Sequence, residues 1–192
     1  MLIPNCITSQ PENPSRKPIS DGFLSKTYFI VILVVFLVLA LMTYAIAQET
    51  YLTTTPTVAN QTQTQINNIR QTITPQGIFF NNFLVSIPAL VPVAGLIIFG
   101  RVWFNTGQTI GQLAYYTHIS PLAYVIGIYV PVGTIESLAY SVILAESLLL
   151  TYALKKGTFI ERLKTQTWKS LILYVALLAI AAIIEAALIK GS

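Results

Sequence analysis

The feature that most constrains this chain is an apolar run from Tyr28 to Ala47, twenty residues without a charged side chain. A helix of this length covers about 30 Å, the thickness of the hydrocarbon core of a bilayer. The run ends in Ala45-Ile46-Ala47, which has the form of a signal-peptidase site. It is nevertheless longer than the roughly 7–15 apolar residues of a signal peptide. We therefore expect an uncleaved membrane anchor.

Further apolar stretches follow, and together they predict an all-α, polytopic membrane helix bundle. The chain has 192 residues and is 54% hydrophobic and only 9% charged, whereas soluble domains carry about 25% charged residues. Basic residues gather before the first stretch and after the fourth, which places both segments in the cytoplasm by the positive-inside rule. The net charge of +4 is therefore no sign of nucleic-acid binding. The five expected spans are 28–47, 83–100, 107–130, 134–154 and 170–189, with the N-terminus inside and the C-terminus outside.

The segments between the spans are polar. Residues 1–27 predict a flexible cytoplasmic tail. Residues 48–80 predict an external loop rich in Thr, Gln and Asn, in which 65–72 suit a short polar helix. This loop carries the sequon Asn60-Gln61-Thr62, and the sequence leaves open whether Asn60 is glycosylated. Residues 155–169 suit either an amphipathic helix on the inner membrane surface or a solvated charged loop.

The third expected span is the most polar of the five. It contains Gln108, Gln112 and His118 and is interrupted at Pro121. The sequence leaves open whether this span is a continuous helix buried among the others or is broken near Pro121. Small residues at GxxxG-type spacing, Gly107 with Gly111 and Ser137 with Ser141, predict close helix packing.

The residues that most enzymes need are missing from the sequence. It has one cysteine (Cys6), one histidine (His118) and one aspartate (Asp21), and no HExxH, CxxC or Walker-type motif. We therefore expect no enzyme activity, no metal site and no cofactor.

Two carboxylates, Glu136 and Glu146, fall within the fourth expected span, and Glu185 falls near the end of the fifth. On one helix, Glu136 and Glu146 lie about 80° apart around the axis and about 15 Å apart along it. Charges at this depth are costly and need partners. They either line a polar path through the bundle, together with Asn82, Gln112 and His118, or are structural groups held by polar neighbours. Glu185 is expected at the outer interface.

Two stretches, Ile78 to Gly111 and Ile128 to Ser147, resemble the stage II sporulation protein M family of integral membrane proteins. The family pattern has an Asn-Asn pair, a helix with Pro and Gly, an Asn-Thr-Gly turn and a Pro-His-Gly-x-x-Glu segment. The matching residues here are Asn81, Asn82, Pro92, Gly95, Asn105, Thr106, Gly107, Pro131, Gly133 and Glu136. Val132 replaces the family's histidine, so no role that needs an imidazole beside Glu136 is carried over.

The resemblance implies a membrane component of a cell-envelope complex, which in spore formers works beside peptidoglycan-degrading partners. It also implies that Glu136 caps the amides of the helix it begins, with Asn81 and Asn82 as its neighbours. The expected partners are the lipid bilayer and other membrane or envelope proteins, with homo-oligomers left open. The expected location is the cell membrane, crossed several times. The alternative function is a small transporter or channel component that uses Glu136 and Glu146. The composition, rich in Ile, Tyr, Thr and Gln, is similar to that of an archaeal member.

Overall fold

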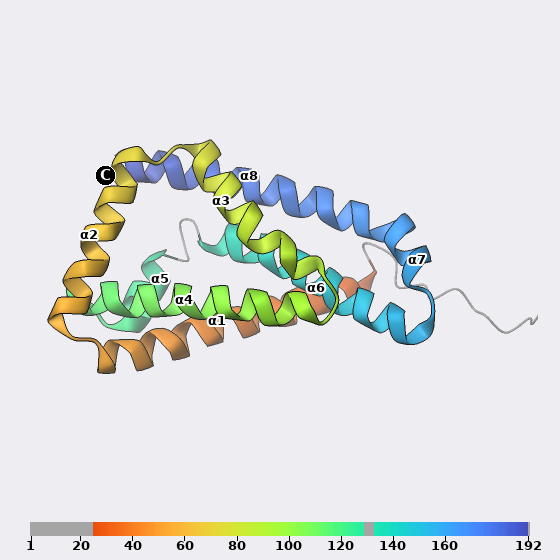
Figure 1. The fold of residues 1–192 in the computed structure, drawn as a ribbon, viewed down its shortest axis with the longest axis horizontal. Helices are drawn as coiled ribbons and strands as arrows, with labels where there is room; N and C mark the ends of the chain where they lie inside the picture. The colour runs from red at the N-terminus through yellow and green to blue at the C-terminus, as the bar shows by residue number, and fades with distance from the viewer. Residues whose placement is uncertain (1–24, 129–132, 192) are drawn as a thin grey trace, which may run out of the picture.

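The computed structural model describes residues 25–128 and 133–191, and every regular element within these two ranges is a helix. The long helices lie along the long axis of the molecule, one helix crosses one end, and a short helix lies at the other end (Figure 1). The long helices are α1 (Lys26–Thr53), α4 (Ala94–Tyr116), α6 (Thr134–Lys156) and α8 (Trp168–Gly191), the crossing helix is α2 (Pro56–Thr72), and the short one is α7 (Phe159–Arg162).

Three helical segments of the described chain are long and apolar enough to cross a membrane. They are Lys26–Thr53, Thr134–Lys156 and Phe159–Ile189, which correspond to α1, α6 and the segment from α7 through α8. The first, fourth and fifth expected spans fall within these helices. The second and third expected spans differ from the helices that the structure has.

The segment expected to be an external loop, 48–80, is mostly helical. α1 continues to Thr53, and α2 fills residues 56–72, where only a short helix over 65–72 was expected. The physical reason is a Thr-Pro pair before α2 and another before α3 (Pro75–Ser86). In each pair the Thr hydroxyl accepts a hydrogen bond from a first-turn amide, and Pro occupies the first helical position. Two Thr-Pro pairs were therefore the helix-start signals in this polar region.

The chain reverses earlier than the expected second span, 83–100, required. α3 ends at Ser86, a 3-10 turn covers Ile87–Leu90, and α4 starts at Ala94 and returns alongside α1 (Figure 1). Val93 has a φ of 65°, in the left-handed region. At Gly95 an added Cβ would lie 2.5 Å from the carbonyl oxygens of the 3-10 turn, so the tight reversal requires glycine there. The expected continuous helix is therefore two helices joined by a hairpin.

The third expected span, 107–130, is broken, which decides the question that the sequence left open. α4 ends at Tyr116, His118 has a φ of 55°, and a short helix α5 (Pro121–Ile128) follows. Proline disfavours helical geometry in the residue before it and suits the first turn of a new helix. The break therefore lies where Pro121 indicated. Residues 107–116 belong to the same helix as residues 94–106.

The helices α6 and α8 are close in extent to the fourth and fifth expected spans, 134–154 and 170–189. α6 ends at Lys156, and the next residue, Gly157, has a φ of 71° and forms the left-handed C-cap. Between α6 and α8 the expected surface segment, 155–169, is helical. α7 is followed by a turn of π-helix, η3 (Leu163–Thr167), which leads directly into α8.

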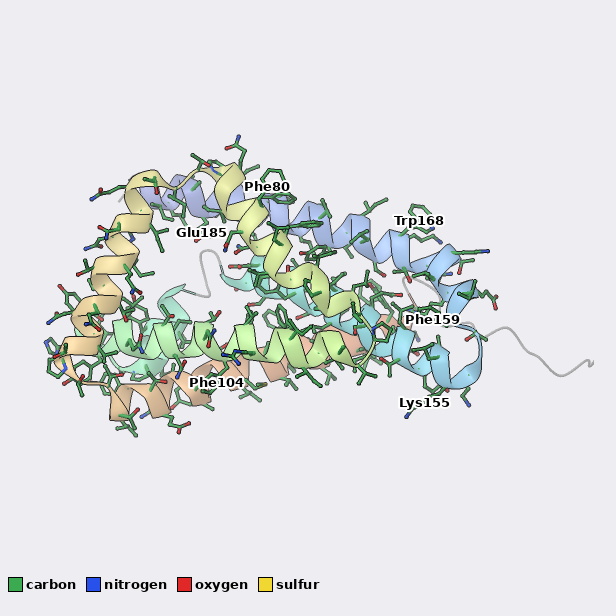
Figure 2. All side chains as sticks on the ribbon, in the orientation of Figure 1. Phe80, Phe104, Lys155, Phe159, Trp168 and Glu185 are labelled. Atoms are coloured by element: carbon green, nitrogen blue, oxygen red, sulfur yellow. The ribbon has the colours of Figure 1, made fainter. Side chains whose placement is uncertain are left out.

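The core is organised around α6. Within its most apolar window 67% of the residues are buried, against 22% for α1 and 28% for the α7–α8 segment, so α6 is the central helix and the other two present broad faces outward. Aromatic rings fill the contact with α4, where Tyr140 packs on Phe99 and Trp103. Trp103 also donates from Nε1 to the carbonyl of Leu39 on α1, at 3.1 Å. Outward-facing apolar side chains include Phe80 and Trp168 (Figure 2).

Candidate functional site

The deeper of the two α6 carboxylates, Glu146, is fully buried and ion-paired. The guanidinium of Arg162 meets it with two hydrogen bonds, Nε to Oε1 at 3.1 Å and Nη2 to Oε2 at 2.9 Å. The hydroxyls of Thr167 and Ser170 donate to Oε1 and Oε2 at 2.8 and 2.9 Å. Tyr28 extends the network from α1 by donating to Ser170 at 2.8 Å. Each carboxylate oxygen therefore accepts two hydrogen bonds.

The π-helical turn η3 positions these donors. Arg162 lies at its N-terminal flank and Thr167 at its last residue, five positions apart, and both side chains reach the same carboxylate. The Thr167 hydroxyl also lies 3.4 Å from the carbonyl of Arg162, the i to i−5 spacing of a π-turn. Because an unpaired charge is costly away from water, this network explains how Glu146 is tolerated at the centre of the bundle.

The second carboxylate, Glu136, lies in the first turn of α6 and belongs to a different cluster. Its Oε1 accepts from Asn82 Nδ2 of α3 at 2.9 Å and from the hydroxyl of Tyr140. Asn81 in turn donates to Asn82 at 3.3 Å. The resemblance implied that Glu136 caps its own helix, but no amide of the described first turn of α6 donates to it. The contact expected between the Asn pair and Glu136 is present through Asn82.

Contacts between α3 and α8 hold Asn82 in place. The hydroxyl of Ser86 donates to the carbonyl of Asn82 and shares a hydrogen bond with the hydroxyl of Tyr174 on α8. The ring of Phe83 packs against Tyr174, with centroids 6.1 Å apart. The side chain of Glu185 lies on the inward side of α8 (Figure 2). The position of Glu136 thus depends on three helices.

A cleft of about 430 Å³ opens beside Glu136, between α3, α4 and α6. Its polar lining includes Asn81, Asn82, Asn105, Thr106, Thr109, Glu136 and Ser137, and its aromatic lining is Phe99, Trp103 and Tyr140. Asn81, Asn105 and Thr106 are exposed, whereas Trp103 and Tyr140 are buried. The cleft therefore has a polar rim and an aromatic floor, and none of its lining residues is basic.

Six of the residues that carry the family resemblance line this cleft, namely Asn81, Asn82, Asn105, Thr106, Gly133 and Glu136. Glu146 is separate, and Pro131 and Val132 lie outside the described residues. His118 follows α4, is exposed and belongs to neither cluster. Gln112 is also outside both clusters, and its side-chain oxygen accepts a hydrogen bond from the hydroxyl of Thr62 on α2 at 2.8 Å.

The glycine pair predicted to pack a helix interface does so. An added Cβ at Gly107 would lie 2.8 Å from the side chain of Ile46, and one at Gly111 would lie 2.5 Å from the carbonyl oxygen of Ala47. Both neighbours belong to α1, so α1 and α4 approach each other closely here.

The sequence reading missed Arg162, Thr167, Ser170 and Tyr28 as partners of Glu146. The available signal was a carboxylate inside an apolar helix, which requires a counter-charge, and five basic residues lie between Glu146 and residue 170. Nothing in their order distinguishes Arg162, because the π-turn decides which side chain faces inward. Among the described residues no group of three or more His, Cys, Asp or Glu side chains comes together to hold a metal ion.

An all-helical bundle with broad apolar outer faces, helices long enough to cross a bilayer and paired charges inside is the architecture of an integral membrane protein. A family model for stage II sporulation protein M matches residues 29–188, from α1 to nearly the end of α8, and the chain belongs to this family. Comparison with curated proteins and with solved structures gives no significant match.

Proposed function

We propose that the chain is a non-enzymatic membrane component of a cell-envelope complex, and that α2 is its main contact surface. The observation that carries this proposal is an ordered polar helix lying across one end of the bundle (Figure 1). Of its seventeen residues only Ala59 is buried. Most of the other α2 residues are Thr, Gln and Asn, and the apolar side chains of Val58 and Ile69 are exposed among them. A surface that mixes polar and apolar side chains suits recognition by another protein. The origin of the chain in an archaeon stays a prediction from composition.

Five crossings of the cell membrane go with this proposal. In addition to the three candidate spans, the α3–η1 segment and α4 would form a hairpin across the bilayer, which puts α2 outside and α7 inside. α8 ends near α2, so the C-terminus would be outside (Figure 1). α1 begins at the opposite end of the bundle from α2, so the N-terminus would be inside (Figure 1).

An accessibility experiment tests the arrangement. Cys6 is the only cysteine, so Cys6→Ser gives a background in which Thr64→Cys on α2 or Lys164→Cys on η3 is the single thiol. Both positions are exposed. A membrane-impermeant maleimide should label Thr64→Cys in intact cells and Lys164→Cys only after permeabilisation. Labelling in the reverse order would overturn the topology.

Site-specific photo-crosslinking in native membranes tests the partner role. A photoreactive residue at Gln65 or Asn68, both exposed on α2, should capture a distinct envelope protein. The matched control is Leu37, an exposed apolar residue of α1 that should contact lipid. Capture of no protein, or of the same proteins from both helices, would count against α2 as a docking surface. Capture of this chain alone would instead indicate a homo-oligomer.

A small transporter or channel component is the second candidate, and the cleft beside Glu136 is the observation that favours it. A path through both carboxylates is disfavoured, because every oxygen of Glu146 is already bonded. Liposomes carrying wild-type protein or Glu136→Gln can be compared using pH- and cation-sensitive dyes. Flux equal to that of empty vesicles would exclude this function.

A further inference from the structure

The cleft between α3, α4 and α6 has no part in the contact surface proposed on α2. Its volume of about 430 Å³ falls in the range of roughly 300–1,000 Å³ typical of small-molecule sites. Sites of this kind combine apolar walls with a few convergent polar groups. The chemistry of those groups indicates which ligand the cleft accepts.

The polar groups of the cleft include one open carboxylate oxygen and asparagine side chains, whose amides both donate and accept hydrogen bonds. Oε1 of Glu136 accepts hydrogen bonds from Asn82 and Tyr140, and no described residue donates to its Oε2. The amide nitrogen of Asn81 donates a hydrogen bond to Asn82, and the side-chain carbonyl oxygen of Asn81 stays open. The exposed amide of Asn105 has no side-chain partner among the described residues. Three acceptor oxygens, one of them on a carboxylate, therefore line one small space.

The donors of the aromatic floor are already occupied. Trp103 gives its indole N–H to the carbonyl of Leu39, and Tyr140 gives its hydroxyl proton to Glu136. These two residues therefore present ring surface to the cleft. A carboxylate beside aromatic rings is the combination that attracts organic cations. With no lysine or arginine in the lining, anions find no counter-charge.

We propose that this cleft binds a primary ammonium group, either on a lipid head group or on a free small amine. An ammonium group has three N–H donors, which match Glu136 Oε2 and the carbonyl oxygens of Asn81 and Asn105. A hard divalent cation fits less well, because it takes six or more oxygen ligands and usually more than one carboxylate. This inference does not depend on the envelope-complex role.

The chain offers a fluorescent reporter inside the cleft. It has two tryptophans, Trp103 on the floor and Trp168, which is 52% exposed on the outside of α8 (Figure 2). In a Trp168→Phe background the emission of Trp103 alone reports on occupancy. Purified protein in micelles is titrated with ethanolamine and, separately, with ethylene glycol, which has a hydroxyl in place of the amine.

Ethanolamine should change the Trp103 emission saturably, and ethylene glycol should not. Glu136→Gln should weaken the apparent affinity by about tenfold or more, because it removes the charge while keeping the shape. The matched control is Glu49→Gln, an exposed carboxylate on α1 outside the cleft lining, which should leave the affinity unchanged. If Glu136→Gln does not fold by circular dichroism, Asn105→Lys at the exposed rim replaces it. Its own ammonium group should compete for the site and abolish the response.

A second arm separates the two sources of the ammonium group. The same protein is placed in nanodiscs of phosphatidylethanolamine or of phosphatidylglycerol. A lipid ligand should shift the Trp103 emission between the two discs, and Glu136→Gln should remove the shift. A response to ethanolamine in micelles without this lipid difference identifies a free amine. No saturable response in either arm, or an equal response to ethylene glycol, would overturn the proposal.

Discussion

Removing Arg162 should be one of the most destabilising single changes at the end of the bundle where α7 lies. Arg162→Met deletes both hydrogen bonds from the guanidinium and leaves Glu146, which is 0% exposed, with only the hydroxyls of Thr167 and Ser170. Breaking a buried ion pair on one side costs roughly 3–5 kcal/mol. Because two hydroxyl donors stay, we expect a loss near the lower limit, about 3 kcal/mol.

The opposite change should cost less. In Glu146→Gln the amide oxygen keeps two of the hydrogen bonds, whereas the amide nitrogen cannot accept the other two. The Arg162 side chain that loses its counter-charge is 10% exposed and lies closer to water than Glu146 does. We expect about 1–3 kcal/mol. In the double variant the unpaired charge is gone, so the loss should be smaller than the sum of the two single losses.

Equilibrium unfolding in mixed micelles, followed by circular dichroism, measures these differences. Lys164→Met, two positions from Arg162 and exposed, is the matched control and should stay within about 0.5 kcal/mol of the wild type. A loss below about 1 kcal/mol for Arg162→Met, or additive losses in the double variant, would refute a structural ion pair.

Three further changes test the packing. Gly95→Ala drives a Cβ into backbone carbonyls of the α3–α4 hairpin and should cost roughly 1–3 kcal/mol in the same unfolding assay, whereas Gly100→Ala, with open space around it, should not destabilise. Gly111→Ala meets the backbone of α1 and should lower the thermal midpoint on size-exclusion chromatography, with Gly127→Ala as the unhindered control. Tyr28→Phe removes one buried donor and should cost about 1 kcal/mol; a loss too small to measure would show that its link to the Glu146 network contributes nothing.

The sequence predicted helices correctly where the residues of one segment alone decide its structure. Long apolar stretches with few charges form membrane helices because lipid cannot hydrogen-bond to an open backbone, and α1, α6 and α8 were predicted from such stretches. The second and third expected spans were misplaced because their apolar content is spread over both sides of two turns. Pro88 and Pro92 lie inside the second expected span, and the chain reverses around them, between the end of α3 at Ser86 and the start of α4 at Ala94. The polar α2 was underestimated because hydropathy carries no information about a helix held by Thr-Pro starts.

The composition and order of residues by themselves determined that the chain is helical and membrane-embedded, and that Glu136 and Glu146 need partners. Only the tertiary structure decided which partners they have. Asn82 is 54 positions from Glu136, and Arg162, at the start of the π-turn, is 16 positions from Glu146. Sequence patterns predict which face of a single helix is apolar and which is polar. The pairing of charges between helices depends on how the helices pack against one another. That is why one carboxylate is sealed in an ion pair and the other borders an open cleft.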